Sequence, residues 1–253
     1  MNAWQAVYDG GAAGYAAVLE PTFLAQAERT VELAGIRPGT RMLDLATGTG
    51  TIARLAAERG AAVVGVDVSE RMLAVGRELS PDLDLRVGDA SALPFPDRVC
   101  DVVTCGLAVT HFVDRDRALS EVRRVLRPGG RFVASTWAEG GSNPARTVMG
   151  VIDRYAAPAE GLDETTWAAP ERGRGILRDA GFTGVSTETH AFDCVFADAE
   201  EALAWVVASP VTASRLARLD PERRAELFAE AHEALADAGL AGSFAFNFYV
   251  ATA

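Results

Sequence analysis

The chain has 253 residues, of which 49% are apolar, so its length and composition suit one large folded domain. It carries 35 acidic residues against 24 arginines, a formal net charge of −11, and such a surface disfavours nucleic-acid and membrane partners. Lysine is absent, which excludes a Schiff-base enzyme using pyridoxal phosphate, a Walker-type phosphate loop and a protein kinase.

Predicted elements in the first half alternate between helices and strands. Residues 1–37 are expected to be a helical arm, since 20–34 have helical apolar spacing and Gly35 follows as a stop signal. Strands are predicted at 42–46, 62–68, 83–87, 99–105 and 131–137, helices at 52–58, 70–79 and 114–125, and a turn at 127–130. This alternation predicts a parallel sheet with helices on both faces.

The second half has a different pattern. Helices are predicted at 145–156, 171–180, 202–207 and from 221, with strands at 185–196 and 244–251. Residues 197–242 would then be a helical insertion before a last strand that rejoins the sheet edge. The insertion either caps a ligand pocket or only covers the edge of the sheet.

A strand, a glycine loop and a helix follow one another over residues 41–58, with Gly48 and Gly50 in the loop. Glycines let the backbone pass close beneath a ligand, and the helix directs free N–H groups at it. Two classes of ligand bind to a strand, glycine loop and helix of this kind. Gly48, Gly50 and Ala53 match the dinucleotide pattern, with Asp67 downstream. The other class is S-adenosylmethionine (SAM), which has no pyrophosphate.

Asp44 distinguishes the two ligand classes, because it ends the strand immediately before the loop. A carboxylate there opposes a pyrophosphate but suits the ammonium of a methionine tail. The alternative is that Asp44 only caps the loop backbone. The sequence therefore favours SAM over NAD, and an NAD-dependent oxidoreductase is the less favoured interpretation.

Further cofactor contacts are predicted after the next two strands. Asp67 can accept both ribose hydroxyls, or else only stabilise the start of the following helix. Met72 lies against adenine or packs in the core. Asp89 can accept from the adenine amino group while the Ala90 N–H donates to a ring nitrogen, with residues 93–95 as a wall.

These motifs together resemble class I SAM-dependent methyltransferases, in the branch that contains ubiquinone/menaquinone C-methyltransferases. The matching segments are 43–50, 65–69, 72, 88–90, 93–95, 101–105 and 126–132. The resemblance implies a Rossmann-like α/β fold with sheet order 3-2-1-4-5-7-6, strand 7 antiparallel, helices on both faces and a helical cap. It implies a single domain over 1–253, with a SAM-binding core at 38–137 and the remainder at 138–253. Ala46 replaces a usual glycine, and the N-terminal signatures of the quinone enzymes are not evident in residues 1–30.

The resemblance and the residue arguments define a set of candidate site residues. Predicted cofactor contacts are Asp44, Ala46, Thr47, Gly48, Thr49, Gly50, Asp67, Val68, Met72, Asp89, Ala90 and Gly106. His111 follows the fourth strand and is the candidate general base, unless it only packs against the next helix. Tyr8 and Tyr15 are candidates to orient the substrate or shield the sulfonium, unless they belong to a packed arm.

The sequence as a whole predicts a methyltransferase for an O, N or C nucleophile of a small metabolite, including specialised natural products. The alternative is a SAM-binding protein that does not methylate, such as a cyclase or a regulatory module. No metal is expected, since three cysteines and three histidines lack ligand spacing. With no membrane-length apolar run and no signal-peptide pattern, we expect a cytoplasmic protein, monomeric or homodimeric.

Overall fold

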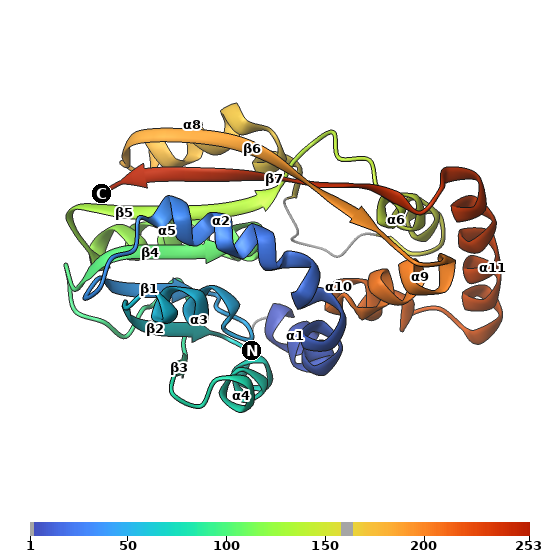
Figure 1. Cartoon of the computed structure of the whole chain (residues 1–253), viewed down its shortest axis with the longest axis horizontal. Helices are drawn as coiled ribbons and strands as arrows, with labels where there is room; N and C mark the ends of the chain where they lie inside the picture. Colours follow the sequence, from blue (N-terminus) through green and yellow to red (C-terminus); the bar gives the residue numbers. More distant parts are fainter. Residues whose placement is uncertain (1–2, 158–163) are drawn as a thin grey trace.

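The computed structural model describes residues 3–157 and 164–253, which surround one sheet (Figure 1). Its strands are hydrogen-bonded in the order β3-β2-β1-β4-β5-β7-β6. Their bounds are β1 Arg41–Leu45, β2 Ala62–Asp67, β3 Asp84–Val87, β4 Cys100–Gly106, β5 Leu126–Trp137, β6 Thr183–Val195 and β7 Ala241–Thr252. The first five strands pair in parallel, and β7 pairs antiparallel with both β5 and β6. The predicted fold class is confirmed.

Helices cover both faces of the sheet because its central strands are apolar on both sides. On one face lie α2 (Leu24–Ala34) and α3 (Thr51–Glu58), and on the other α5 (Arg115–Val125) and α8 (Pro170–Asp179), with α7 (Glu164–Ala168) beside α8 (Figure 1). Helix α4 (Glu70–Leu79) packs next to β3. It begins after Ser69, whose hydroxyl accepts from the Met72 amide in the usual geometry of an N-cap.

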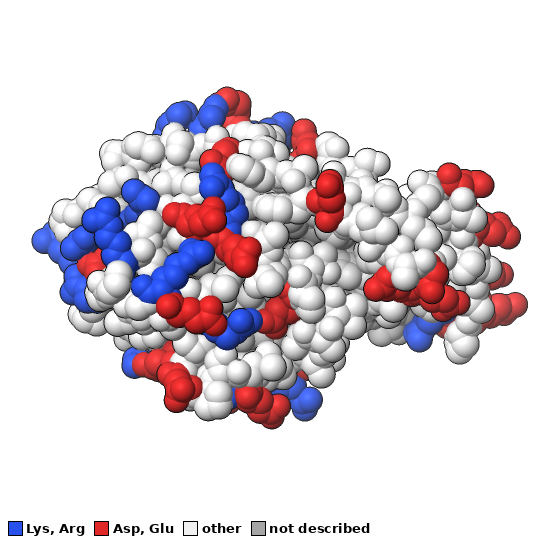
Figure 2. All heavy atoms as spheres, viewed as in Figure 1, with Lys and Arg blue, Asp and Glu red and all other residues white. Residues whose placement is uncertain are grey.

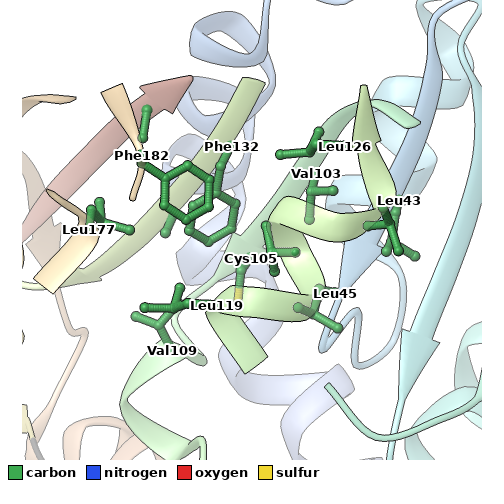
Figure 3. Packing of buried hydrophobic residues seen from close by; sticks show 14 of the residues in the cluster. Leu43, Leu45, Val103, Cys105, Val109, Leu119, Leu126, Phe132, Leu177 and Phe182 are labelled. Carbon is green, nitrogen blue, oxygen red and sulfur yellow. The ribbon is translucent and has the colours of Figure 1, made fainter. Parts of the chain in front are cut away.

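The core between the sheet and helices α5 and α8 is continuous and apolar (Figure 3). Leu43 of β1 and Val103 of β4 are buried in it. Phe132 of β5 stacks on Phe182 with ring centroids 5.6 Å apart. This packing fixes the carboxyl ends of β1, β2 and β4 beside one another, where parallel α/β sheets bind their ligands.

A second group of helices lies beyond those strand ends and forms a cap (Figure 1). It consists of α6 (Pro144–Tyr155), α9 (Ala199–Ala208), α10 (Pro210–Leu216) and α11 (Pro221–Ala238). The last three lie between β6 and β7 in the chain, within the predicted insertion at 197–242, and share an apolar cluster with α6 and β7. Helix α1 (Ala3–Gly14) packs against both α4 and α10, so it spans the core and the cap.

Several local features differ from the sequence prediction, including helix α7, which was not among the predicted elements. The expected turn at 127–130 is a bulge inside β5, because Cys100 pairs with Leu126 and Val102 then pairs with Arg131. Helix α10 was not among the predicted elements, although Pro210 at its first turn is a typical start signal. Among the described residues, no helix is both long and apolar enough to cross a membrane.

Candidate functional site

The loop between β1 and α3 closes as a tight turn. The Gly50 amide donates to the Thr47 carbonyl at 2.8 Å. Ala46, Gly48 and Gly50 have φ values of 54°, 58° and 87°. A left-handed alanine is strained, and such strain is typical of functional sites. A Cβ on Gly50 would face two leucine side chains, so Gly50 shapes the turn and does not line a cavity.

Two adjoining cavities lie along this loop. The main cavity has a volume of about 1170 Å³, and the small cavity about 50 Å³. Of the predicted cofactor residues, the main cavity is lined by Ala46, Gly48, Asp67, Val68, Met72, Asp89, Ala90 and Gly106. The small cavity is lined by Asp44, Thr47 and Thr49, together with three of the same residues, Ala46, Gly48 and Gly106. Residues from four strand ends therefore meet at one place.

Asp44 is buried at the back of the small cavity. Its two carboxylate oxygens accept from the hydroxyls of Thr47 and Thr104, each at 2.6 Å. Burial raises the pKa of Asp44 to about 6, although these hydrogen bonds oppose the rise. Asp44 thus contacts the loop through the side-chain hydroxyl of Thr47, and it also lines the small cavity.

Asp67 holds the glycine loop next to the end of β2. One oxygen accepts from the Gly48 amide and the other from the Ser69 amide, each at 2.9 Å. Burial raises its pKa, and the backbone hydrogen bonds oppose the rise. Each carboxylate oxygen can accept two hydrogen bonds, so Asp67 keeps the capacity for two hydroxyls.

The end of β3 supplies another carboxylate to the main cavity. Asp89 uses Oδ1 to accept from both the amide and the hydroxyl of Ser91, at 2.7 Å. Its Oδ2 has no hydrogen-bond partner among the described residues. Met72 is buried and lines the same cavity. Met72 and Asp89 are therefore brought together, whereas residues 93–95, predicted as a wall for the base, are not among the residues that line this cavity.

Glu20 is a site residue that the sequence analysis missed. Its carboxylate accepts from the hydroxyls of Thr49 at 2.8 Å and Thr51 at 2.6 Å, and Arg54 lies 3.2 Å away. It also lines the small cavity. Glu20 is about thirty positions before the loop, and no sequence motif links the two.

His111 lines the main cavity in the short helical turn Val109–His111. Its Nε2 lies 3.1 Å from the Tyr8 hydroxyl, and its Nδ1 lies 3.0 Å from Oγ1 of Thr110. Burial lowers the pKa of His111 to about 4, so the ring is neutral near pH 7. Tyr15 also lines this cavity, and its hydroxyl has no hydrogen-bond partner among the described residues.

The far end of the main cavity is enclosed by the cap and is largely aromatic. The ring of Trp205 in α9 stacks on Phe244 at 4.9 Å, and Trp137 lies 4.7 Å from Phe246. Arg146, Asp153 and Arg215 add charge at this end. None of these residues was singled out from the sequence, because they come from three distant segments of the chain. One end of the cavity therefore carries the predicted cofactor residues, and the other an apolar chamber.

In sequence, known proteins resemble this chain mainly in the part that carries the predicted cofactor residues. Residues 43–134 match the family model described as a methyltransferase domain. A demethylmenaquinone methyltransferase of Renibacterium salmoninarum is 40% identical over 129 residues, which cover 51% of this chain and 54% of that protein. The structure of YcgJ from Bacillus subtilis has a TM-score of 0.63 at 18% identity, covering 89% and 97% of the two chains. Phosphoethanolamine N-methyltransferase 2 of Haemonchus contortus has a TM-score of 0.61 at 21% identity, covering 100% and 60%.

The sheet order and the glycine loop define a class I methyltransferase fold. Residues 43–134 match the model of a methyltransferase domain, and the resemblance to the ubiquinone/menaquinone C-methyltransferases is confirmed. The chain spans about half the length of the curated relatives it matches, 54% for the one above. The family model ends within β5, so the cap and its chamber lie outside it.

Proposed function

We propose that the chain is a SAM-dependent methyltransferase that moves a methyl group to an O, N or C nucleophile of a small metabolite, a class that includes specialised natural products. The observation that carries this proposal is a single cavity that joins Gly48, Asp67 and Asp89 to the chamber beneath the cap. The Haemonchus protein is described in complex with S-adenosylhomocysteine and phosphomonomethylethanolamine. That protein thus holds a demethylated cofactor and a small acceptor on the same fold.

The residues present fit SAM by their chemistry. Asp67 would accept from the ribose hydroxyls and Oδ2 of Asp89 from the adenine amino group, because both acceptors retain free lone pairs. Gly48 would leave room for the ligand, since a Cβ there meets only the Met72 methyl at 3.2 Å. Asp44 and Glu20 would make the small cavity acidic, which suits an ammonium and opposes a pyrophosphate.

SAM, when bound, supplies a methyl group that is already activated by its positively charged sulfur. The protein then has to hold the acceptor in line with that methyl and keep water out. Aromatic walls and helix α1 enclose the chamber for this purpose. We propose that the acceptor takes the place of the Tyr8 hydroxyl at Nε2 of His111 and passes its proton to that nitrogen, that Tyr8 then orients the substrate, and that Tyr15 lies against the sulfonium or the substrate. With a pKa near 4, His111 is a weak base, which favours an acceptor that ionises easily.

Calorimetry with SAM, S-adenosylhomocysteine and NAD tests the cofactor assignment. We expect both sulfur nucleosides to bind and NAD not to bind, and the reverse result would contradict the proposal. A panel of candidate acceptors is then incubated with the protein and SAM, and S-adenosylhomocysteine is measured by mass spectrometry. Formation of this product supports a methyltransferase. Tight SAM binding without product for any acceptor supports instead the non-methylating alternative, a cyclase or a binding module.

A further inference from the structure

The arginines and most of the acidic side chains line opposite ends of the main cavity, although Asp153 accompanies the two arginines at the cap end. Asp67, Asp89 and Asp114 line the end predicted to hold the cofactor. Both arginines of the lining, Arg146 and Arg215, are at the cap end. The arginines at the cap end contrast with the outer surface of the cap, where acidic side chains gather along α11 (Figure 2). Of the two lining arginines only Arg215 is buried, since Arg146 is exposed, so a buried cation lies beneath an acidic exterior.

Arg215 is the more deeply placed of the two arginines, with only 3% of its surface exposed. It belongs to α10, and its Nη2 donates to Asp153 Oδ1 at 2.6 Å and to the Ala156 carbonyl. Its Nε is buried without a hydrogen-bond partner. Its Nη1 also has no acceptor among the described residues. All hydrogen bonds between this guanidinium and the described part of the protein are therefore made by one of its three nitrogens, Nη2.

A buried guanidinium with unpaired N–H groups is unfavourable. The group carries five donors and cannot lose its charge, so each unpaired donor keeps a desolvation cost. Arginines at such depth are normally fully paired. Asp153 does not complete the pairing, because its side chain is about half exposed and contacts only Nη2. Nε is closed off by protein, but Nη1 is not among the buried unpaired atoms, so a ligand in the cavity that Arg215 lines can supply the acceptor for Nη1.

We propose that Arg215 binds a carboxylate on the methyl acceptor, and that the acceptor is an aromatic acid. This inference rests on the proposed function, since it names the class of molecule in the chamber. Charge-assisted hydrogen bonds from arginine to carboxylate are among the strongest in proteins. The flat rings of Trp137, Trp205 and Phe244 line the same chamber and suit an aromatic body. Arg215 would thus hold the acid group while the rings hold the remainder of the acceptor.

The test compares acids with their uncharged carboxamides of nearly equal shape. Binding of 1-naphthoate, 2-naphthoate and benzoate, and of the corresponding amides, is measured by calorimetry with S-adenosylhomocysteine present at saturation. We expect at least one acid to bind about tenfold more tightly than its amide, the difference typical of hydrogen bonds to a charged group. Equal affinities within every pair, or no binding of any acid, would overturn the inference.

Variants assign the preference to Arg215. Arg215→Gln is expected to remove the acid preference, and Arg215→Lys to keep part of it, with S-adenosylhomocysteine affinity unchanged in both. The matched control is Arg154→Gln, since Arg154 pairs with Glu230 in the cap but does not line the cavity. Persistence of the full preference in Arg215→Gln would overturn the inference. If the variants fail to fold, the comparison of acid and amide in the unmodified protein still decides it.

The two proposals fail in different ways. If the unmodified protein does not bind S-adenosylhomocysteine, the proposed function is wrong. If it binds this nucleoside but shows no acid preference, only the assignment to Arg215 is wrong.

Discussion

The hydroxyl of Tyr8 lies 3.1 Å from Nε2 of His111, although 103 positions separate the two residues. The ring of Trp4 also meets His111 edge-on, with centroids 4.7 Å apart. Helix α1 therefore completes the surroundings of a histidine that follows β4. This contact links the segment that covers the cavity to the residue proposed as the base.

Replacing His111 with alanine is expected to lower turnover by about 100-fold or more, the usual range for a general base. SAM affinity should not change, because His111 is not among the predicted cofactor contacts. Tyr8→Phe should give a smaller loss, since it removes one hydrogen bond and keeps the ring. Turnover and calorimetry measure the two effects. His232→Ala on the exposed side of α11 is the control. Full turnover in His111→Ala would remove this residue from the mechanism.

SAM affinity is expected to depend on pH through Asp44. The pKa of Asp44 is about 6, so its carboxylate is charged above that value and protonated below it. If the charged form holds the ammonium, affinity should fall by about tenfold between pH 7 and pH 5 and be nearly constant from pH 7 to pH 8. Asp44→Asn should bind weakly at every pH. A wild-type affinity that does not change from pH 5 to pH 8 would contradict this role.

The raised pKa of Asp44 has the opposite pH dependence for the folding stability of the cofactor-free protein. The folded pKa of Asp44 is above its ordinary value of 3.8, so Asp44 contributes stability below about pH 4, and this is lost as pH rises through 6. Asp44→Asn should therefore be more stable than the wild type at pH 8, by about 1–3 kcal/mol, and lose this advantage at pH 4. Urea unfolding at both pH values measures the difference. If Asp44→Asn changed the free energy of unfolding equally at pH 4 and pH 8, titration of Asp44 would not be the cause of the change.

Glu20→Gln is expected to weaken SAM binding by about tenfold, because Glu20 joins the N-terminal segment to the loop through the hydroxyls of Thr49 and Thr51. Part of the loss comes from removing negative charge from the small cavity. Glu28→Gln, at an exposed position of α2, is the matched control. Calorimetry with SAM distinguishes the two variants, and equal affinities would exclude Glu20 from the cofactor site.

Two glycines of α8 are expected to respond oppositely to alanine. A Cβ on Gly173 would lie 2.4 Å from the ring of Tyr249, whereas one on Gly175 would meet nothing within 4 Å. Gly173→Ala should lower the free energy of unfolding by about 1–3 kcal/mol through overpacking. Gly175→Ala should raise it by about 0.5–1 kcal/mol through helix propensity. Chemical unfolding measures both, and similar effects in the two variants would contradict the packing described for α8 and β7.

Fold class and cofactor loop were predictable because their signals are local. Apolar runs of strand length alternate with helical spacing over residues 41–137, and right-handed crossovers then leave few possible topologies. Capping by Ser69 depends on a short-range hydrogen bond to the amide three positions on, and Asp114 starts α5 in the same way, one residue outside that helix. Asp44 lies one residue before the end of β1, Asp67 ends β2 and Asp89 lies two residues beyond β3, so their meeting at one sheet edge follows from the parallel order.

The acceptor chamber was not predictable, because its residues come from separate segments without a shared spacing. Glu20 reaches the glycine loop only because the chain before α2 folds across it. Arg215 faces the cavity only because α10 packs beside α1 and α6.

The sequence by itself determined the sheet, the loop and the carboxylates at the strand ends, since periodicity and capping act within a few residues. Only the tertiary structure decided what lies opposite them. The partners of His111, the pairing of Arg215 and the aromatic walls depend on how the cap and α1 pack over the sheet, which long-range burial of apolar surface controls.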